Sequence, residues 1–147
     1  MAAKWKVLIV EDEIPVAMMM VAALTYAGFD VATAHTGQKG LGLATTREFD
    51  LITLNVDLPD ASGFDICRKL KLTPISRMTP VVFVSARSGE QDLQRGLELG
   101  AVDYIVMPFE ATDFIFRIVS QAKIKTPPVI ALTRKETASR LKSWAVV

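Results

Sequence analysis

The sequence has few of the residues that covalent or redox chemistry usually needs. Its one cysteine, Cys67, excludes an internal disulfide and suits a reducing compartment, and we expect it to be a packed thiol. Its one histidine, His35, lies near a predicted turn, which favours a surface or capping role. A single histidine also argues against a conventional nucleophile–histidine–acid triad.

Long stretches of one chemical character are also absent. The net charge is +1 and there is no run of five or more like charges, which argues against a nucleic-acid surface. No segment reaches the roughly 18 uncharged apolar residues that a membrane span requires, and residues 1–5 lack the apolar stretch of a signal peptide. These absences predict a cytoplasmic domain that binds neither nucleic acid nor membrane directly.

A repeating pattern runs through most of the chain. The 147 residues, 50% of them hydrophobic and 22% charged, suffice for one domain with a sizeable core. Short apolar runs rich in β-branched residues alternate with segments of helical periodicity, which predicts an α/β fold with helices on both faces of a parallel sheet. The predicted strands are 7–10, 31–34, 51–54, 81–84 and 104–106, and the predicted helices are 14–27, 37–46, 64–72, 89–99 and 112–122.

Residues with chemical potential follow several predicted strands at the point where each strand ends. Glu11 and Asp12 follow the first strand, and Asn55 follows the third. Ser85 follows the fourth strand and Met107 the fifth. In a doubly wound sheet these strand ends meet in one crevice at the topological switch point, so we expect the five residues to line a single pocket.

The order and spacing of these residues, together with Gly63 and the stretch 100–104, resemble the receiver domain of two-component response regulators. The resemblance covers roughly residues 5–122. It implies a flavodoxin-like, doubly wound sheet of five parallel strands in the order 2-1-3-4-5, within a receiver-like domain over residues 1–122. Residues 123–147 are interpreted as a C-terminal extension or linker, in which 133–144 read as basic and helical.

The resemblance also implies roles for the pocket residues. Glu11 and Asp12 match the acid pair that holds Mg²⁺, and Ser85 matches the hydroxyl that receives the phosphoryl oxygen. Tyr104 matches the aromatic residue that rotates as the readout. Asn55 stands at the phosphoacceptor position, where a carboxamide cannot form an acyl phosphate. Met107 stands at the position of the lysine that pairs with the phosphoryl group.

The two departures make sense as a pair. In receiver domains, which this chain resembles, three acids and one lysine give the pocket a formal charge of −2. Here the two acids, together with the neutral Asn55 and Met107, give the same formal charge of −2. Loss of the aspartate alone would weaken the charge pairing of a partly desolvated lysine, which is costly in free energy. Replacing that lysine with the thioether of methionine removes the unpaired charge. The joint change at positions 55 and 107 favours a naturally degenerate receiver over an engineered asparagine.

Metal binding and residual chemistry stay open. Glu11, Asp12 and the Asn55 carbonyl offer three oxygens, so weak Mg²⁺ binding is allowed although no cofactor is required. Asp57, two residues beyond Asn55, is expected to be a solvated loop acid. Its alternatives are an added metal ligand or a displaced phosphoacceptor, which would lack the counter-charge of a lysine. We expect Arg87 and Lys4 to be solvated charges.

A partner surface is predicted on the face formed by the fourth helix, the fifth strand and the fifth helix, which resembling proteins use to meet partners or to dimerise. Leu93, Leu99, Val102 and Phe116 are assigned to this face. If they are exposed together they form an apolar contact patch. The alternative is that Leu93 and Leu99 belong to the core.

The sequence therefore favours a non-enzymatic, phosphorylation-independent signalling module that binds a protein partner or a second copy of itself. The alternatives are a receiver that still accepts phosphoryl groups with Mg²⁺ through Asp57, and a receptor for a small ligand. The resemblance further implies a cis Met107–Pro108 bond. The three methionines at 18–20 are expected to pack in the core or at its rim.

Overall fold

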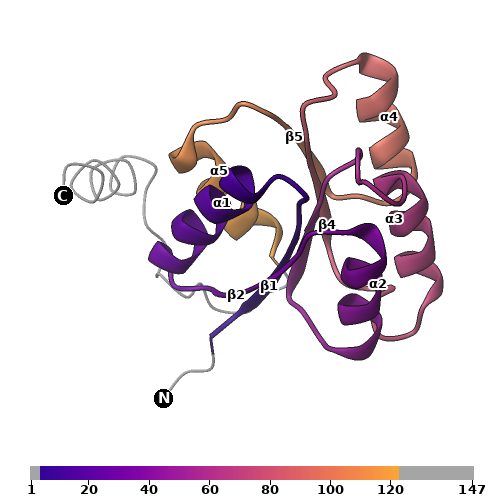
Figure 1. Ribbon diagram of the computed structural model, residues 1–147, viewed down its shortest axis with the longest axis horizontal. Coiled ribbons are helices and arrows are strands. Elements are labelled where there is room, and N and C mark those ends of the chain that lie inside the picture. Colours follow the sequence, from indigo (N-terminus) through magenta and orange to yellow (C-terminus); the bar gives the residue numbers. More distant parts are fainter. Residues whose placement is uncertain (1–3, 123–147) are drawn as a thin grey trace.

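The computed structural model describes residues 4–122 and has the predicted architecture. A sheet of five parallel strands has the order β2-β1-β3-β4-β5, with helices on both faces (Figure 1). Residues 123–147, interpreted above as an extension or linker, lie outside the described residues. The elements are β1 (Lys6–Val10), α1 (Ile14–Tyr26), β2 (Asp30–Ala34), α2 (Gly37–Thr46), β3 (Leu51–Leu54), α3 (Gly63–Leu72), β4 (Val81–Ser85), α4 (Glu90–Glu98), β5 (Asp103–Val106) and α5 (Ala111–Gln121).

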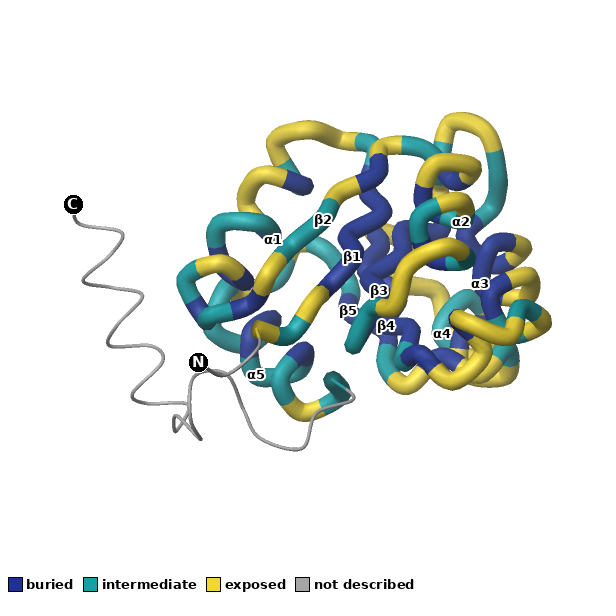
Figure 2. Tube along the Cα trace, turned by 90° about the horizontal axis from the view of Figure 1, so that it is seen from below, coloured by how far each residue is buried: buried dark blue, intermediate teal, exposed yellow. Residues whose placement is uncertain are grey.

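The sheet separates two layers of helices. Figure 1 shows α1 and α5 on one face and α2, α3 and α4 on the other. Because side chains alternate along a strand, Val7 and Ile9 of β1 enter the core beneath α1 and α5, whereas Leu8 and Val10 enter the core on the opposite face. The three inner strands lie deep inside the molecule (Figure 2). Their apolar runs are therefore continuous, as expected for strands covered on both faces.

Single residues confirm some expectations and correct others. Cys67 is fully buried, and burial raises the pKa of its thiol. His35 is exposed, with Nδ1 2.9 Å from the backbone oxygen of Glu11. Met20 packs in the core as expected. Met18 is 66% exposed, so the expectation of core or rim packing was wrong for Met18. Among the described residues, no helix combines the length and the apolar character needed to cross a membrane.

The start of α3 lies directly against the chain that leaves β3. The Ser62 hydroxyl accepts the N–H of Phe64, and the Gly63 N–H donates to the Val56 carbonyl at 2.7 Å. A Cβ at Gly63 would lie 2.0 Å from the backbone oxygen of Asn55, far inside van der Waals contact. Only glycine allows this approach, so Gly63 holds the backbone of the predicted phosphoacceptor position in place.

Gly63→Ala should lower the free energy of unfolding by more than about 2 kcal/mol, because the obstructing atoms are backbone and cannot rotate away. Gly42→Ala is the matched control. Gly42 lies in α2 with no atom within 4 Å of an added Cβ, so alanine should raise stability by about 0.5–1 kcal/mol. Urea unfolding of the two variants measures both effects, and equal stabilities would contradict the close packing of α3 on residue 55.

Candidate functional site

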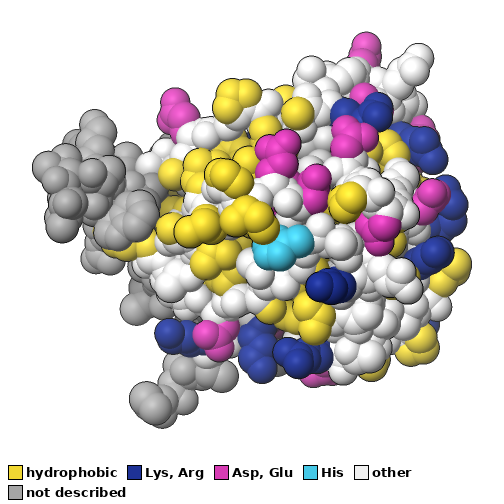
Figure 3. Space-filling model, in the orientation of Figure 1, with side chains coloured by type: hydrophobic (Ala, Val, Ile, Leu, Met, Phe, Trp, Pro, Cys, Tyr) yellow, Lys and Arg dark blue, Asp and Glu magenta, His cyan; other side chains and the backbone are white. Residues whose placement is uncertain are grey.

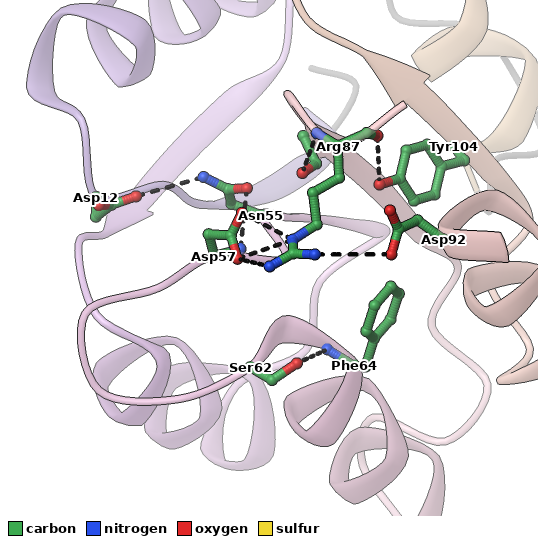
Figure 4. A network of polar contacts seen from close by, with 9 residues as sticks. Asp12, Asn55, Asp57, Ser62, Phe64, Arg87, Asp92 and Tyr104 are labelled. Carbon is green, nitrogen blue, oxygen red and sulfur yellow. Dashed lines mark hydrogen bonds and ion pairs between the residues drawn. The ribbon is translucent and has the colours of Figure 1, made fainter. Parts of the chain in front are cut away.

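The carboxyl ends of β1 and β3 bring Glu11, Asp12 and Asn55 together as predicted. The Asn55 amide nitrogen lies 3.2 and 3.3 Å from the two Glu11 carboxylate oxygens and 3.3 Å from Asp12 Oδ1. The amide oxygen of Asn55 accepts the backbone N–H of Asp57 at 3.3 Å. Figure 4 shows the Asn55 amide between Asp12 and the loop that follows β3. The asparagine thus offers its donor to the acids and its acceptor to its own loop.

Glu11 is the most perturbed acid of this pocket. Its side chain is buried, with 1% of the residue exposed, and its pKa is raised to about 7. Burial is the main cause, and a hydrogen bond and repulsion with Asp12 add to it. The N–H of Glu13 and the amide of Asn55 oppose the rise, because both donate to the charged form. Glu11 is therefore partly protonated at neutral pH, so the formal charge of −2 counted from the sequence overstates the negative charge.

Asp57 and Arg87 form an ion pair that the sequence reading did not predict. Arg87 Nε lies 2.9 Å from both Asp57 carboxylate oxygens, and its Nη2 lies 2.9 Å from Oδ1. Nη1 of the same guanidinium lies 3.9 Å from Asp92 at the start of α4. The hydrogen bond to Asp57 is the main reason that the pKa of Arg87 rises further. Both side chains are about half exposed, which agrees with the expectation of solvated charges, although the two are paired with each other.

The backbone of Arg87 ties two further residues to this loop. The buried Ser85 hydroxyl accepts the Arg87 N–H at 3.1 Å, and the Tyr104 hydroxyl donates to the Arg87 carbonyl at 2.8 Å (Figure 4). Tyr104 is 5% exposed, and its ring centroid lies 5.8 Å from that of Phe83. Burial raises the pKa of Tyr104, which keeps its hydroxyl a donor. The predicted switch residue therefore points inward.

Met107 supplies no charge at the end of β5. It is half-buried and packs against the core beneath α1 and α5. Its N–H donates to the Ser85 carbonyl at 2.8 Å, and the Met107–Pro108 bond is cis, as predicted. The position that the resemblance assigns to a lysine is thus occupied by apolar filling.

The donor set does not fit Mg²⁺ in this arrangement. The ion prefers oxygen ligands in near-octahedral geometry, but the Asn55 nitrogen faces the Glu11 and Asp12 carboxylates. The Asn55 oxygen, expected as a third ligand, instead faces the N–H of Asp57. Within residues 4–122 no three His, Cys, Asp or Glu side chains are grouped so that they could hold a metal ion.

The predicted partner face is only partly exposed. Leu93 and Leu99 are half-buried and pack against the core on the α2–α3–α4 side, which agrees with the core alternative for these two residues. Val102 is 40% exposed and Phe116 is half-buried. Leu97, which the sequence reading did not assign to this face, is 51% exposed. The apolar surface here is therefore smaller than predicted.

An ion pair fixes α5 against β5 on the same face. Arg117 Nη2 lies 2.6 Å from Asp103 Oδ1, and Nε lies 2.8 Å from Oδ2. The same guanidinium donates to the Tyr104 carbonyl at 3.0 Å. Burial would raise the pKa of Asp103, but the hydrogen bonds from Arg117 and from the Tyr104 N–H, together with the charge of Arg117, lower it. The sequence offers a signal for this pair, since Asp103 begins a strand and Arg117 lies on the helix that follows it.

Residues 7–119 match the family model described as the response regulator receiver domain, and the chain belongs to this family. It is therefore a receiver domain of two-component signalling, a kind of module that contacts partner proteins. The response regulator ArlR of Staphylococcus aureus is 39% identical over 113 residues, which cover 77% of this chain and 50% of ArlR. The chain thus spans about half the length of the curated relatives it matches.

Solved structures give the same fold. The chemotaxis protein CheY4 of Vibrio cholerae is 28% identical with a TM-score of 0.75, over 79% of this chain and 97% of CheY4. The non-phosphorylated receiver domain of HemR from Leptospira biflexa is 31% identical with a TM-score of 0.74, over 88% of this chain and 97% of that domain.

The raised pKa of Glu11 predicts a pH-dependent stability. The folded protein holds this proton more tightly than the unfolded chain, so the stabilisation is present below pH 4.5 and is lost as the pH rises through about 7. The loss should amount to about 3 kcal/mol in metal-free buffer. Glu11→Gln should remove most of it, and Glu13→Gln, an exposed neighbour, should not. Denaturant unfolding from pH 4.5 to 8.5 with EDTA measures the slope, and equal slopes in both variants would refute the assignment.

Proposed function

We propose that this receiver domain is a degenerate one: a phosphorylation-independent protein-interaction module and not an enzyme. The observation that carries the proposal is the amide of Asn55, whose nitrogen donates to Glu11 and Asp12 at the phosphoacceptor position. A carboxamide has no anionic oxygen with which to attack phosphorus. The apolar Met107 supports the same reading, because it leaves a transferred phosphoryl group without a cationic partner.

The alternative, phosphoryl acceptance with Mg²⁺ through Asp57, is disfavoured by the contacts of that carboxylate. Both of its oxygens lie 2.9 Å from Arg87 Nε, and a guanidinium bound in this way lowers the nucleophilicity of the oxygens. An attacking Asp57 would have to give up these bonds. Among the described residues, no group of three His, Cys, Asp or Glu side chains forms a metal site that includes it.

The contacts of Arg87 support a single, constitutive arrangement of the loop between β4 and α4. Its side chain binds Asp57, its N–H binds Ser85, and its carbonyl accepts the hydroxyl of Tyr104. The loop is thus held by groups that belong to the chain itself. A ligand shifts a conformational equilibrium only through a difference in affinity for the two states, and no phosphoryl group is needed to hold this state.

The output surface is then permanently presented. Its apolar residues are Leu97, Val102 and Phe116, from α4, the turn before β5, and α5. Leu93 and Leu99 support it from beneath. The partner that fits an apolar surface of this size is a second copy of the chain or another protein with a matching apolar patch, bound without regard to phosphodonor.

Incubation with acetyl phosphate and Mg²⁺ should leave the intact mass of the protein unchanged. Asn55→Asp should bind Mg²⁺ about tenfold more tightly or better, measured by calorimetry, because a third carboxylate replaces an amide donor. The same variant should gain little phosphoryl acceptance, because Met107 remains. A stable adduct of phosphate mass on the unaltered protein that disappears in Asp57→Asn would establish the alternative function.

Association should depend on the output surface and not on the pocket. Phe116→Asp should weaken self-association or partner binding about tenfold, because a carboxylate would be buried without a partner. Asn55→Ala should leave it nearly unchanged. Ile75→Asp is the matched control, since Ile75 is 47% exposed on the connection between α3 and β4 and is not one of the residues assigned to this surface. Analytical ultracentrifugation measures the effect, and a loss with Asn55→Ala but not with Phe116→Asp would show that the pocket governs output.

A further inference from the structure

Helix α1 is apolar on all sides, which is unusual for a helix at the surface of a small domain. Its 13 residues, IPVAMMMVAALTY, include no charged side chain. A surface helix normally has an apolar stripe facing the core and polar residues opposite. Here Ala17, Met20 and Leu24 are buried, yet Ile14 is 48% and Met18 66% exposed on the outer side. An apolar outer side of this kind marks a contact surface.

The exposed side of α1 borders a shallow groove. One wall consists of Ile14, Met18, Val21 and Thr25, and the other of Thr33 and His35 at the end of β2. Figure 3 shows hydrophobic side chains gathered over α1, with the single histidine at their edge. Acidic groups lie at the helix start, where Asp12 and the exposed Glu13 precede Ile14. The groove therefore suits a segment that is apolar on one side and basic around it.

The end of α5 places the rest of the chain beside this groove. Helix α5 packs against α1 on the same face of the sheet, and Ala122, which follows it, belongs to the same apolar cluster as Val21 and Tyr26. The described part of the chain therefore ends next to α1. A helix of 13 residues is about 20 Å long, and 25 extended residues reach several times that distance.

The charges and apolar residues of segment 123–147 match the groove. Residues 1–122 contain eleven Lys and Arg against fifteen Asp and Glu, whereas residues 123–147 contain six against one. The segment also has two large apolar residues, Leu141 and Trp144, three positions apart in the sequence. Opposite net charges favour the contact, and Leu141 and Trp144 can bury the exposed methionine.

We propose that segment 123–147 folds back onto α1 of its own chain, so that Leu141 and Trp144 cover Ile14 and Met18. The basic residues of the segment then lie near the exposed Glu13. This inference is independent of the proposed function, because it involves neither the Asn55 pocket nor the Phe116 surface.

The intrinsic fluorescence of Trp144 in the full chain tests the contact. Trp5→Phe leaves Trp144 as the only tryptophan, since the sequence has two. Its emission should be blue-shifted and its quenching by acrylamide well below that of free N-acetyltryptophanamide. Met18→Lys, which makes the groove polar and repels a basic segment, should red-shift the emission and raise the quenching constant about twofold. The signal should not change on serial dilution.

Met78→Lys is the matched control, because Met78 is also a methionine, is 70% exposed, and lies on the connection between α3 and β4. It should leave the emission of Trp144 unchanged. Three results would overturn the inference. The first is that Trp144, with Met18 unchanged, is quenched by acrylamide as readily as N-acetyltryptophanamide. The others are equal effects of Met18→Lys and Met78→Lys on the emission, and loss of the blue shift on dilution. The last would assign the groove to the segment of a second copy.

Discussion

The contact between the Asn55 amide and the two carboxylates of Glu11 and Asp12 is the interaction on which the pocket depends. Two acids at the end of β1 are brought together in a place where Glu11 has almost no access to water. With methionine at position 107, the donors to these carboxylates within residues 4–122 are the Asn55 amide and the N–H of Glu13. Burial of Glu11 is the main cause of its raised pKa, and the repulsion from Asp12, which neutral donors do not cancel, adds to it.

The cationic group that the pocket lacks is found one loop further out. Arg87 reaches back from the end of β4 to Asp57 after β3, and its backbone holds Ser85 and Tyr104. The ion pair is exposed and is worth only about 0–1 kcal/mol on its own. Its importance is positional, since one residue connects the ends of three neighbouring strands. A loop held in this way has fewer arrangements open to it, whatever the strength of the single bonds.

The fold was predictable from the sequence because strand and helix periods alternate without interruption, and the topology follows from the handedness of the crossovers. The pocket residues were predictable for the same reason, because strand ends meet at one edge. The Asp57–Arg87 ion pair was harder to predict, because a contact between side chains on two adjacent loops produces no periodic pattern in the sequence. The exposure of Met18 was missed because an apolar residue in a helix reads as core in the sequence, and the pKa of Glu11 depends on burial that a formal charge count ignores.

The close contact at Gly63 separates two properties of position 55. Helix α3 rests on the backbone oxygen of that residue, and the side chain takes no part in the contact. An exchange of aspartate for asparagine there alters what the pocket can react with while every atom that seats the helix stays in place. In a lineage of such domains, substitutions in the pocket can remove a reaction while helix α3 keeps its position, and the surfaces that other proteins recognise are inherited intact.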